Sequence, residues 1–379
     1  MLTVCIDYSS ALAHAAGVSR YVRELVDALV AAPDSVAITL VHNTPKTTHP
    51  EKASLSVPIV GLPYGIKSWR AAMLAGGHVF GRSLSRKARF SVFHGPDCIV
   101  PAVNEPTVVT VHDLTVLSHP QFHSRLNRAY MRLALPTMVR RARYILADSQ
   151  STRAEVISRL NVAPDKVVVI YPGINHSRFY PVPITKATRT VSDYLNSSKP
   201  FLLALGTLEP RKNLVTLLQA FAKVAPENDC QLVLAGVKGW GDNALNRLIG
   251  TLGLTQRVFL PGFVPDGVLP SLYSACQAFV YPSWFEGFGF PVLEAMACGA
   301  PVICSNTSSI PEIAGDVGLL TPPGDIDGLA ALLRSTKVYA DSHHTIRELG
   351  IKQAAKFTWR QTALETIQIY QRAASDDPG

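Results

Sequence analysis

Short apolar runs alternate with helical segments along this chain, and this alternation limits it to a few folds. A β-rich run at 2–6 is followed by a loop through Gly17 and then by apolar residues at helical spacing over 22–29. Further buried-strand candidates lie at 37–41, 108–111, 144–147 and 167–171. Strands that alternate with helices predict doubly wound parallel sheets, whose ligands bind at the carboxyl ends of the strands.

The same pattern begins again near residue 200. A strand is predicted at 201–205 and an apolar helix at 214–224. Four more strand candidates lie at 231–235, 258–260, 278–281 and 301–304. We therefore expect an α/β protein with two Rossmann-like domains and a closing amphipathic helix. The expected divisions are a first domain at 1–180, a linker rich in Pro, Ser, Thr and Asn at 181–198, a second domain at 199–355 and the closing helix at 356–379.

Composition excludes several classes of protein. Of the 379 residues, 47% are hydrophobic and 17% charged, which is enough apolar material for packed cores and excludes a disordered chain. The six cysteines form no CxxC pair, so neither structural zinc nor a disulfide framework is expected. The thin spread of these cysteines favours a reducing cytoplasm. The first residues lack a signal-peptide pattern and no apolar run reaches about 18 residues, so neither a signal peptide nor a membrane span is expected.

Positive charge is concentrated in the first half. Residues 1–180 hold 20 of the 36 Lys and Arg but only 11 of the 28 Asp and Glu. The basic residues form two clusters: Lys67, Arg70, Arg82, Arg86, Lys87 and Arg89, then Arg125, Arg128, Arg132, Arg140, Arg141 and Arg143. Apolar residues lie within the first cluster: Trp69, Met73, Leu74, Val79 and Phe80. Basic clusters of this kind favour contact with the inner face of an anionic membrane or with a phosphorylated acceptor. A basic face that is simply solvated, with no specific partner, explains the charge equally well. Nucleic acid is not expected, because no nucleic-acid-binding motif accompanies the charge.

The most informative stretch is 286–294, with the sequence Glu-Gly-Phe-Gly-Phe-Pro-Val-Leu-Glu. It follows the predicted strand 278–281 and opens a helix, with Pro291 near the first position. A glycine-rich turn onto a helix N-terminus presents N–H groups that can hold a diphosphate. Glu286 and Glu294 could bind sugar hydroxyls from one side of the turn. The alternatives are a plain turn and a carboxylate that interacts with the helix dipole.

Four further residues, in three loops, could also contact a diphosphate or a sugar. Arg211 and Lys212 follow the strand 201–205, where adjacent cations can neutralise a leaving diphosphate, although two solvated loop cations are the alternative. His112 follows the strand 108–111 and could hydrogen-bond a sugar or shuttle a proton, although a lone histidine is more often structural. Gly17 would let a phosphate approach the backbone, although any turn between a strand and a helix can use a glycine.

No metal is expected. Asp325-Ile326-Asp327 has the DxD form of metal-dependent transferases, but it precedes an apolar helix, where Asp325 is a usual N-cap. The sequence contains no HExxH, Walker A or GxSxG pattern.

The chain resembles retaining glycosyltransferases of family 4 over nearly its whole length. Residues 286–294 are similar to the family's Glu-x7-Glu motif, and 206–214 to its phosphate-binding loop. Further matches lie at 93–96, 110–114, 171–174, 295–302 and 308–315. The resemblance implies the GT-B fold: an acceptor-binding and a donor-binding Rossmann-like domain that face each other across a cleft, with a C-terminal helix that crosses back to the first domain.

The resemblance also implies roles for individual residues. Arg211 and Lys212 would hold the donor diphosphate. Glu294 would bind the ribose hydroxyls, and Glu286 and His112 the transferred sugar. Together the implied catalytic residues are Arg211, Lys212, Glu286 and His112. The remaining donor-binding positions are Gly17, Gly206, Val264, Phe288, Gly289, Phe290 and Leu293. One departure is Ser19, which stands where many relatives have a second glycine.

The function expected from the resemblance is a metal-independent, retaining hexosyltransferase. Within the family the chain looks most like bacterial mannosyltransferases that use GDP-mannose to build O-antigen or other surface polysaccharide. We therefore expect mannose transfer to a lipid-linked (polyprenyl) or oligosaccharide acceptor, with the nucleotide sugar as a substrate and no cofactor. The alternative is a transferase of the same fold that uses UDP-glucose, or another UDP- or dTDP-sugar, on a soluble acceptor. A non-enzymatic binding module is disfavoured, because it has no need of the Glu286/Glu294 and Arg211/Lys212 sets.

Overall fold

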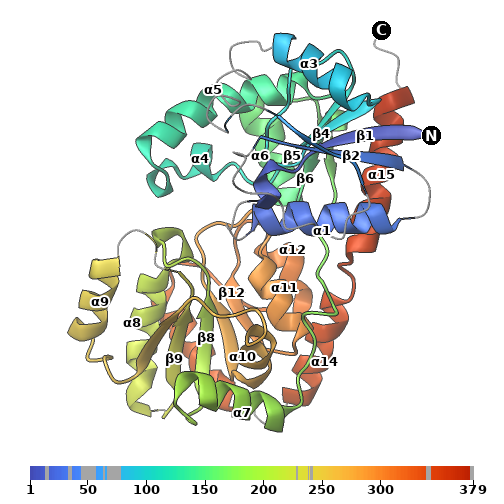
Figure 1. Cartoon of the computed structure of the whole chain (residues 1–379). Coiled ribbons are helices and arrows are strands. Elements are labelled where there is room, and N and C mark those ends of the chain that lie inside the picture. The colour runs from blue at the N-terminus through green and yellow to red at the C-terminus, as the bar shows by residue number, and fades with distance from the viewer. Residues whose placement is uncertain are drawn as a thin grey trace. The chain divides into compact units, whose positions relative to one another are not determined.

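The structure is a computed structural model that describes residues 1–12, 17–32, 36–43, 57–62, 65, 78–227, 229–237, 239, 242–338 and 343–375. The chain divides into two compact units. Unit 1 consists of Met1–Gly173 with Thr358–Gly379, and unit 2 of Ile174–Phe357. Each unit contains one parallel sheet with helices on its faces (Figure 1). This confirms the prediction of two Rossmann-like α/β sheets.

The sheet of unit 1 has seven strands in the order β3-β2-β1-β4-β5-β6-β7. All neighbouring strands are parallel. The strands are β1 (Leu2–Asp7), β2 (Val36–His42), β3 (Ile59–Gly61), β4 (Val92–Gly95), β5 (Thr107–Val111), β6 (Tyr144–Ala147) and β7 (Val167–Val169). The order reverses between β1 and β4, which is where ligands of such sheets bind, beyond the carboxyl ends of the strands.

Helices cover both faces of this sheet. They are α1 (Val18–Ala31), α3 (His78–Ala88), α4 (Thr115–Ser118), α5 (Arg125–Arg141), α6 (Gln150–Leu160) and α15 (Trp359–Ser375). Residues of α3, α5 and α6 share one hydrophobic core with the sheet. Helix α15 packs against α1 and contacts β1, β4 and β5, so the C-terminal helix returns to the first sheet (Figure 1).

A buried histidine ties α15 to the sheet. The Nδ1 atom of His94 lies 2.6 Å from the hydroxyl of Tyr370, and its Nε2 lies 2.9 Å from Oγ1 of Thr110. Burial lowers the pKa of His94 to about 3, so the ring is neutral and the contact is a hydrogen-bonded one. Gly173 lies against the start of α15, and a Cβ there would lie 2.0 Å from the backbone nitrogen of Trp359.

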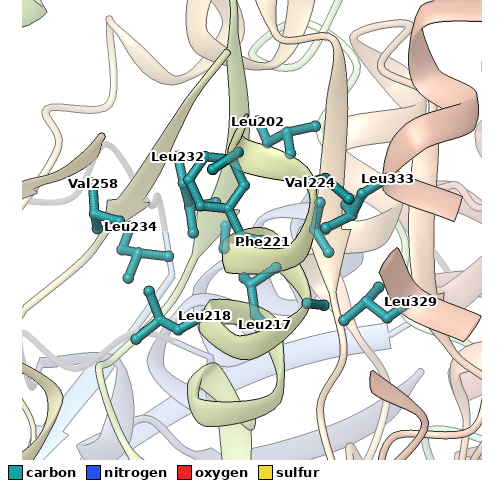
Figure 2. Close-up of a cluster of buried hydrophobic side chains, with 14 of the residues drawn as sticks. Leu202, Leu217, Leu218, Phe221, Val224, Leu232, Leu234, Val258, Leu329 and Leu333 are labelled. Carbon is teal, nitrogen blue, oxygen red and sulfur yellow. The ribbon is translucent and has the colours of Figure 1, made fainter. Parts of the chain in front are cut away.

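The sheet of unit 2 has six parallel strands in the order β10-β9-β8-β11-β12-β13. They are β8 (Phe201–Leu205), β9 (Gln231–Ala235), β10 (Val258–Gly262), β11 (Ala278–Tyr281), β12 (Val302–Ser305) and β13 (Leu319–Thr321). The helices are α7 (Ile184–Leu195), α8 (Leu214–Val224), α9 (Asp242–Thr251), α10 (Leu269–Ala275), α11 (Phe290–Ala297), α12 (Ile310–Ala314), α13 (Ile326–Val338) and α14 (His343–Ala354). Phe221 of α8 lies at the centre of a core formed by α8, α13 and the strands (Figure 2).

The structure differs from the sequence analysis in two ways. The stretch 181–198, predicted as a linker, contains α7, which packs on α10 and buries Ala187 and Val191. Its polar composition hid the apolar positions, which recur only once per turn. The strands β3, β4 and β13 were not predicted, because Pro58, His94 and Gly318 interrupt the apolar runs there. Lys67, Trp69, Arg70, Met73 and Leu74 of the first basic cluster lie outside the described residues.

Replacing Phe221 with alanine should lower the free energy of unfolding by about 3–5 kcal/mol, because it leaves a cavity in the core of unit 2. Val215→Ala on the same helix is the matched control, since Val215 is 51% exposed and its loss should change stability by no more than about 0.5 kcal/mol. Urea denaturation followed by circular dichroism measures both. Equal losses in the two variants would contradict this account of the core.

Candidate donor site

Two loops meet at the carboxyl edge of the sheet of unit 2 because the strands before them, β8 and β11, are neighbours. The loop after β8 ends in the 3-10 turn Pro210–Lys212, and the loop after β11 leads to α11. Asn213 joins the second loop, since its Nδ2 donates a 3.0 Å hydrogen bond to the carbonyl oxygen of Pro282. The backbone nitrogen of Trp284 donates to the carbonyl oxygen of Arg211 at 2.9 Å. The fold thus fixes the two loops against each other before any ligand binds.

Glu286 forms ion pairs with both predicted cations. Its Oε2 lies 2.5 Å from Nη1 of Arg211, and its Oε1 lies 2.8 Å from Nζ of Lys212. Arg211 also pairs with Glu209, at 2.8 Å. Lys212 donates to the hydroxyl of Tyr281 at 2.6 Å and lies 4.8 Å from the centre of that ring. The alternative of two solvated loop cations is wrong, because the two side chains are only 20% and 12% exposed and both are paired.

The charges in this cluster stabilise one another. Burial raises the pKa of Glu286, but the nearby Arg211 and Lys212 outweigh burial and lower it to about 2. Burial lowers the pKa of Lys212, and Glu286 opposes that shift. Glu286 is therefore a carboxylate throughout the physiological range and a weak base. It can orient cations and accept hydrogen bonds, but it is poorly suited to removing a proton.

The turn before α11 has the predicted form. Gly289 precedes the helix with φ +106°, and Pro291 lies in the first turn. The hydroxyl of Ser309 donates to the carbonyl oxygens of Glu286 and Phe288, at 3.0 and 2.7 Å, and so holds the turn in place. Pro291 has no N–H, and the amides of Val292 and Leu293 donate to the carbonyl oxygen of Gly289, at 3.0 and 3.4 Å. The positive end of the helix dipole favours an anion at this turn.

The side chains at the other predicted donor-binding positions differ in their exposure to solvent. The side chains of Phe288, Leu293 and Val264 are buried, so only their backbone can meet a ligand. Phe290, the first residue of α11, is partly exposed. In the loop of Val264, the neighbouring Phe263 side chain is 68% exposed.

Glu294 and Glu286 have separate partners. Glu294 lies inside α11, is 4% exposed and accepts a 2.9 Å hydrogen bond from the hydroxyl of Tyr273 in α10. Glu286 lies in the preceding loop and is held by the two cations. Glu294 is thus bound to a tyrosine hydroxyl inside the unit, whereas Glu286 is bound to two cations in the loop.

Two of the predicted glycines, Gly17 and Gly206, adopt positive φ angles that residues with a side chain rarely adopt. Gly17 has φ +74° and directly precedes α1, where Ser19 is buried in the first turn. Gly206 has φ +144°, and a Cβ there would lie 3.1 Å from Cε of Lys212. The backbone conformation favours glycine at both positions, and Gly206 also leaves room for the Lys212 side chain.

His112 of unit 1 is engaged at both ring nitrogens. Its Nδ1 lies 2.6 Å from Oδ2 of Asp148, and its Nε2 lies 2.7 Å from the carbonyl oxygen of Pro96. Because both partners are acceptors, both nitrogens donate and the ring is an imidazolium. Burial lowers the pKa of His112, but Asp148 raises it further, to about 9. In this arrangement the ring has no lone pair left to accept a proton, and a role for His112 in contacting a sugar or moving a proton stays a prediction.

Three partners in these clusters were missed by the sequence analysis: Glu209, Tyr281 and Asp148. Asp148 follows β6, the neighbour of β5, so the rule that adjacent strand ends meet could have found it. Glu209 lies two residues before Arg211, but sequence alone does not show which way a loop side chain points.

Asp325 has the capping role expected of it. Its Oδ1 accepts a 2.8 Å hydrogen bond from the backbone nitrogen of Gly328, at the start of α13. Asp327 pairs instead with Lys223, at 2.6 Å. Within the described ranges, no three His, Cys, Asp or Glu side chains gather closely enough to hold a metal ion.

Known protein families match both units. A model of Glycosyltransferase Family 4 matches residues 15–178, and a model of glycosyl transferases group 1 matches residues 192–353. The chain is 36% identical over 284 residues to the O-antigen chain mannosyltransferase B of Escherichia coli, which covers 74% of each protein. The chain therefore belongs to the glycosyltransferases of family 4.

Solved structures show that this glycosyltransferase has the GT-B fold. Sucrose-phosphate synthase from Thermosynechococcus elongatus superposes with a TM-score of 0.80 at 22% identity, over 98% of this chain and 99% of that one. Anabaena HepE, solved with UDP and glucose, superposes with a TM-score of 0.78 at 19% identity, over 98% and 100% of the two chains.

The ion pair of His112 should make stability depend on pH. Because its folded pKa is raised above the ordinary 6.5, the stability it contributes is fully present below pH 6.5 and is lost as the pH rises through about 9. Asp148→Asn should lower the pKa of His112 below 6.5, since burial then dominates, and should flatten this pH dependence. Titration of the imidazole by NMR measures the pKa, and urea denaturation at several pH values measures stability. A midpoint at or below 6.5 in the unchanged protein would contradict the imidazolium.

Proposed function

We propose that this glycosyltransferase transfers mannose from GDP-mannose to a lipid-linked or oligosaccharide acceptor in surface polysaccharide synthesis, with retention of anomeric configuration. The observation that carries the proposal is the Arg211–Lys212–Glu286 cluster beside the N-terminus of α11. The choice of mannose is supported by the similarity to the Escherichia coli O-antigen mannosyltransferase.

In this proposal the diphosphate of the donor binds between the two cations and the end of α11. As the bond between the sugar and the phosphate breaks, negative charge grows on the leaving oxygen, and Arg211 and Lys212 stabilise it. Both cations are already oriented by Glu286, so little reorganisation is needed during the reaction. These protein cations do the work that a divalent metal does in other transferases, which is why we expect no metal requirement.

The leaving phosphate is the proposed base. Glu286, with its pKa near 2, is a poor proton acceptor, and His112 is already protonated. The departing phosphate oxygen can take the proton of the acceptor hydroxyl as that hydroxyl attacks from the same face. Glu286 would accept hydrogen bonds from hydroxyls of the donor sugar when the donor binds beside the two cations.

This glycosyltransferase would act in the cytoplasm at the inner face of the cell membrane. None of the helices in the described part of the chain combines the length and hydropathy needed to span a bilayer. A polyprenyl-linked acceptor would nevertheless bring its reacting end to the membrane surface, where the enzyme must meet it.

Calorimetric titration with GDP, UDP, dTDP and ADP, in the presence of EDTA, tests the proposed donor. We expect GDP to bind most tightly and EDTA to have no effect. Preference for another nucleotide would keep the transferase but reject GDP-mannose. Absence of binding to any of the four would reject the donor site itself.

Arg211→Ala and Lys212→Ala should each lower kcat/KM by at least about 100-fold, because each removes a charge that stabilises the leaving diphosphate. Lys223→Ala is the matched control, since Lys223 is an exposed cation of unit 2 that pairs with Asp327. Initial-rate assays with a nucleotide sugar measure the effect. Unchanged kcat/KM in both site variants would contradict the assignment.

Glu286→Gln should lower the transfer rate by at least about tenfold while GDP binding is kept or strengthened, because the two cations lose a competing carboxylate but also lose their orientation. Glu209→Gln is the control that removes only the second partner of Arg211. Its transfer rate should fall less than that of Glu286→Gln. Loss of GDP binding in Glu286→Gln, together with the loss of transfer, would contradict separate roles for the carboxylate and the cations.

A further inference from the structure

Helix α5 lies on the outside of unit 1 (Figure 1) and carries two exposed leucines. Its inner face, which includes Leu135 and Met138, is buried in the core of the unit. On the opposite face, Leu126 is 82% exposed and Leu133 is 67% exposed. The exposed Ala129 lies between them, so the three recur at the i, i+3, i+7 spacing of one helical stripe. Two such leucines on one stripe form an apolar surface that the described chain leaves open to solvent.

Arginines border this stripe without carboxylates to balance them. Residues 114–147 contain no Asp or Glu. Arg125, Arg132 and Arg140 are exposed on α5, and Arg128 is half-buried. Within the described part of the chain, none of these four forms an ion pair with a carboxylate. The helix thus carries uncompensated positive charge beside exposed apolar side chains. We call Arg125, Leu126, Ala129, Arg132 and Leu133 the α5 surface.

We propose that the α5 surface docks on an anionic lipid bilayer. Leucines on such a helix enter the boundary between headgroups and acyl chains, while arginines beside them pair with lipid phosphates. Duplex nucleic acid fits less well, because its phosphates would satisfy the arginines but leave the leucines without an apolar partner. The inference rests on the proposed function in one respect, the identity of the acceptor. A lipid-linked glycan would lie in the same membrane surface on which α5 docks.

Co-sedimentation with vesicles tests this docking in the full chain. The unchanged protein should bind vesicles of phosphatidylcholine mixed with phosphatidylglycerol, and should not bind vesicles of phosphatidylcholine alone. Added salt should weaken the binding, because it screens the arginines from the lipid phosphates.

Two double variants separate charge from apolar insertion. Arg125→Gln with Arg132→Gln should lower the partition coefficient about 25-fold, about fivefold for each cation. Leu126→Ser with Leu133→Ser should lower it at least about tenfold, because the apolar contribution is lost while the charge is kept. All four side chains are exposed, so the variants should fold normally, which thermal melting by circular dichroism checks.

Matched controls lie on unit 2. Lys186→Gln with Arg189→Gln removes the same charge from exposed positions of α7. Ile184→Ser with Leu349→Ser removes apolar side chains that are 57% and 46% exposed. Both controls should change vesicle binding less than about twofold.

Failure of the unchanged protein to bind anionic vesicles would overturn the docking proposal, as would equal binding to neutral vesicles or normal binding by both α5 variants. If the α5 variants instead lost affinity for a DNA duplex, the surface would be a nucleic-acid site and the proposal would also be wrong. Titration with GDP in parallel keeps the two proposals apart: GDP binding without vesicle binding rejects only the α5 docking.

Discussion

The donor site depends on one carboxylate that holds two cations. Glu286 comes from the loop after β11, and Arg211 and Lys212 from the turn after β8. Opposite charges at 2.5 and 2.8 Å, at side chains that are at most 20% exposed, interact strongly because little water screens them. The interaction needs β8 and β11 to be neighbours, and the cores of both faces of the sheet keep them so. The fold thus serves to bring two short loops into one charged cluster.

The sequence predicts which residues form this cluster, but it does not predict which of their side chains contact one another. Arg211, Lys212 and Glu286 could be found because each lies in a short motif after a strong strand signal. That Glu286 faces both cations could not be found, since a loop side chain's direction depends on contacts far along the chain. The partner of His112 was within reach of the sequence, because Asp148 follows the neighbouring strand and adjacent strand ends meet. Strand β4 was missed because His94 and Gly95 interrupt its apolar run, and helix α7 because it is mostly polar.

Charge acts differently in the two units. The cations of the candidate donor site are partly buried and paired, which suits the binding of one anion at a defined place. The arginines of α5 are mostly exposed and have no carboxylate partner among the described residues, which suits a broad anionic surface. Net charge alone, +8 for the whole chain, does not separate these roles. Burial and pairing do.

We propose that Arg211 and Lys212 hold the diphosphate of the donor while Glu286 keeps them oriented. A crystal structure of the protein with GDP tests this proposal. Phosphate oxygens should lie within hydrogen-bond distance of both side chains and beside the N-terminus of α11, with Glu286 still in contact with at least one cation. A diphosphate bound elsewhere, with Arg211 and Lys212 paired only to Glu286 and Glu209, would contradict it.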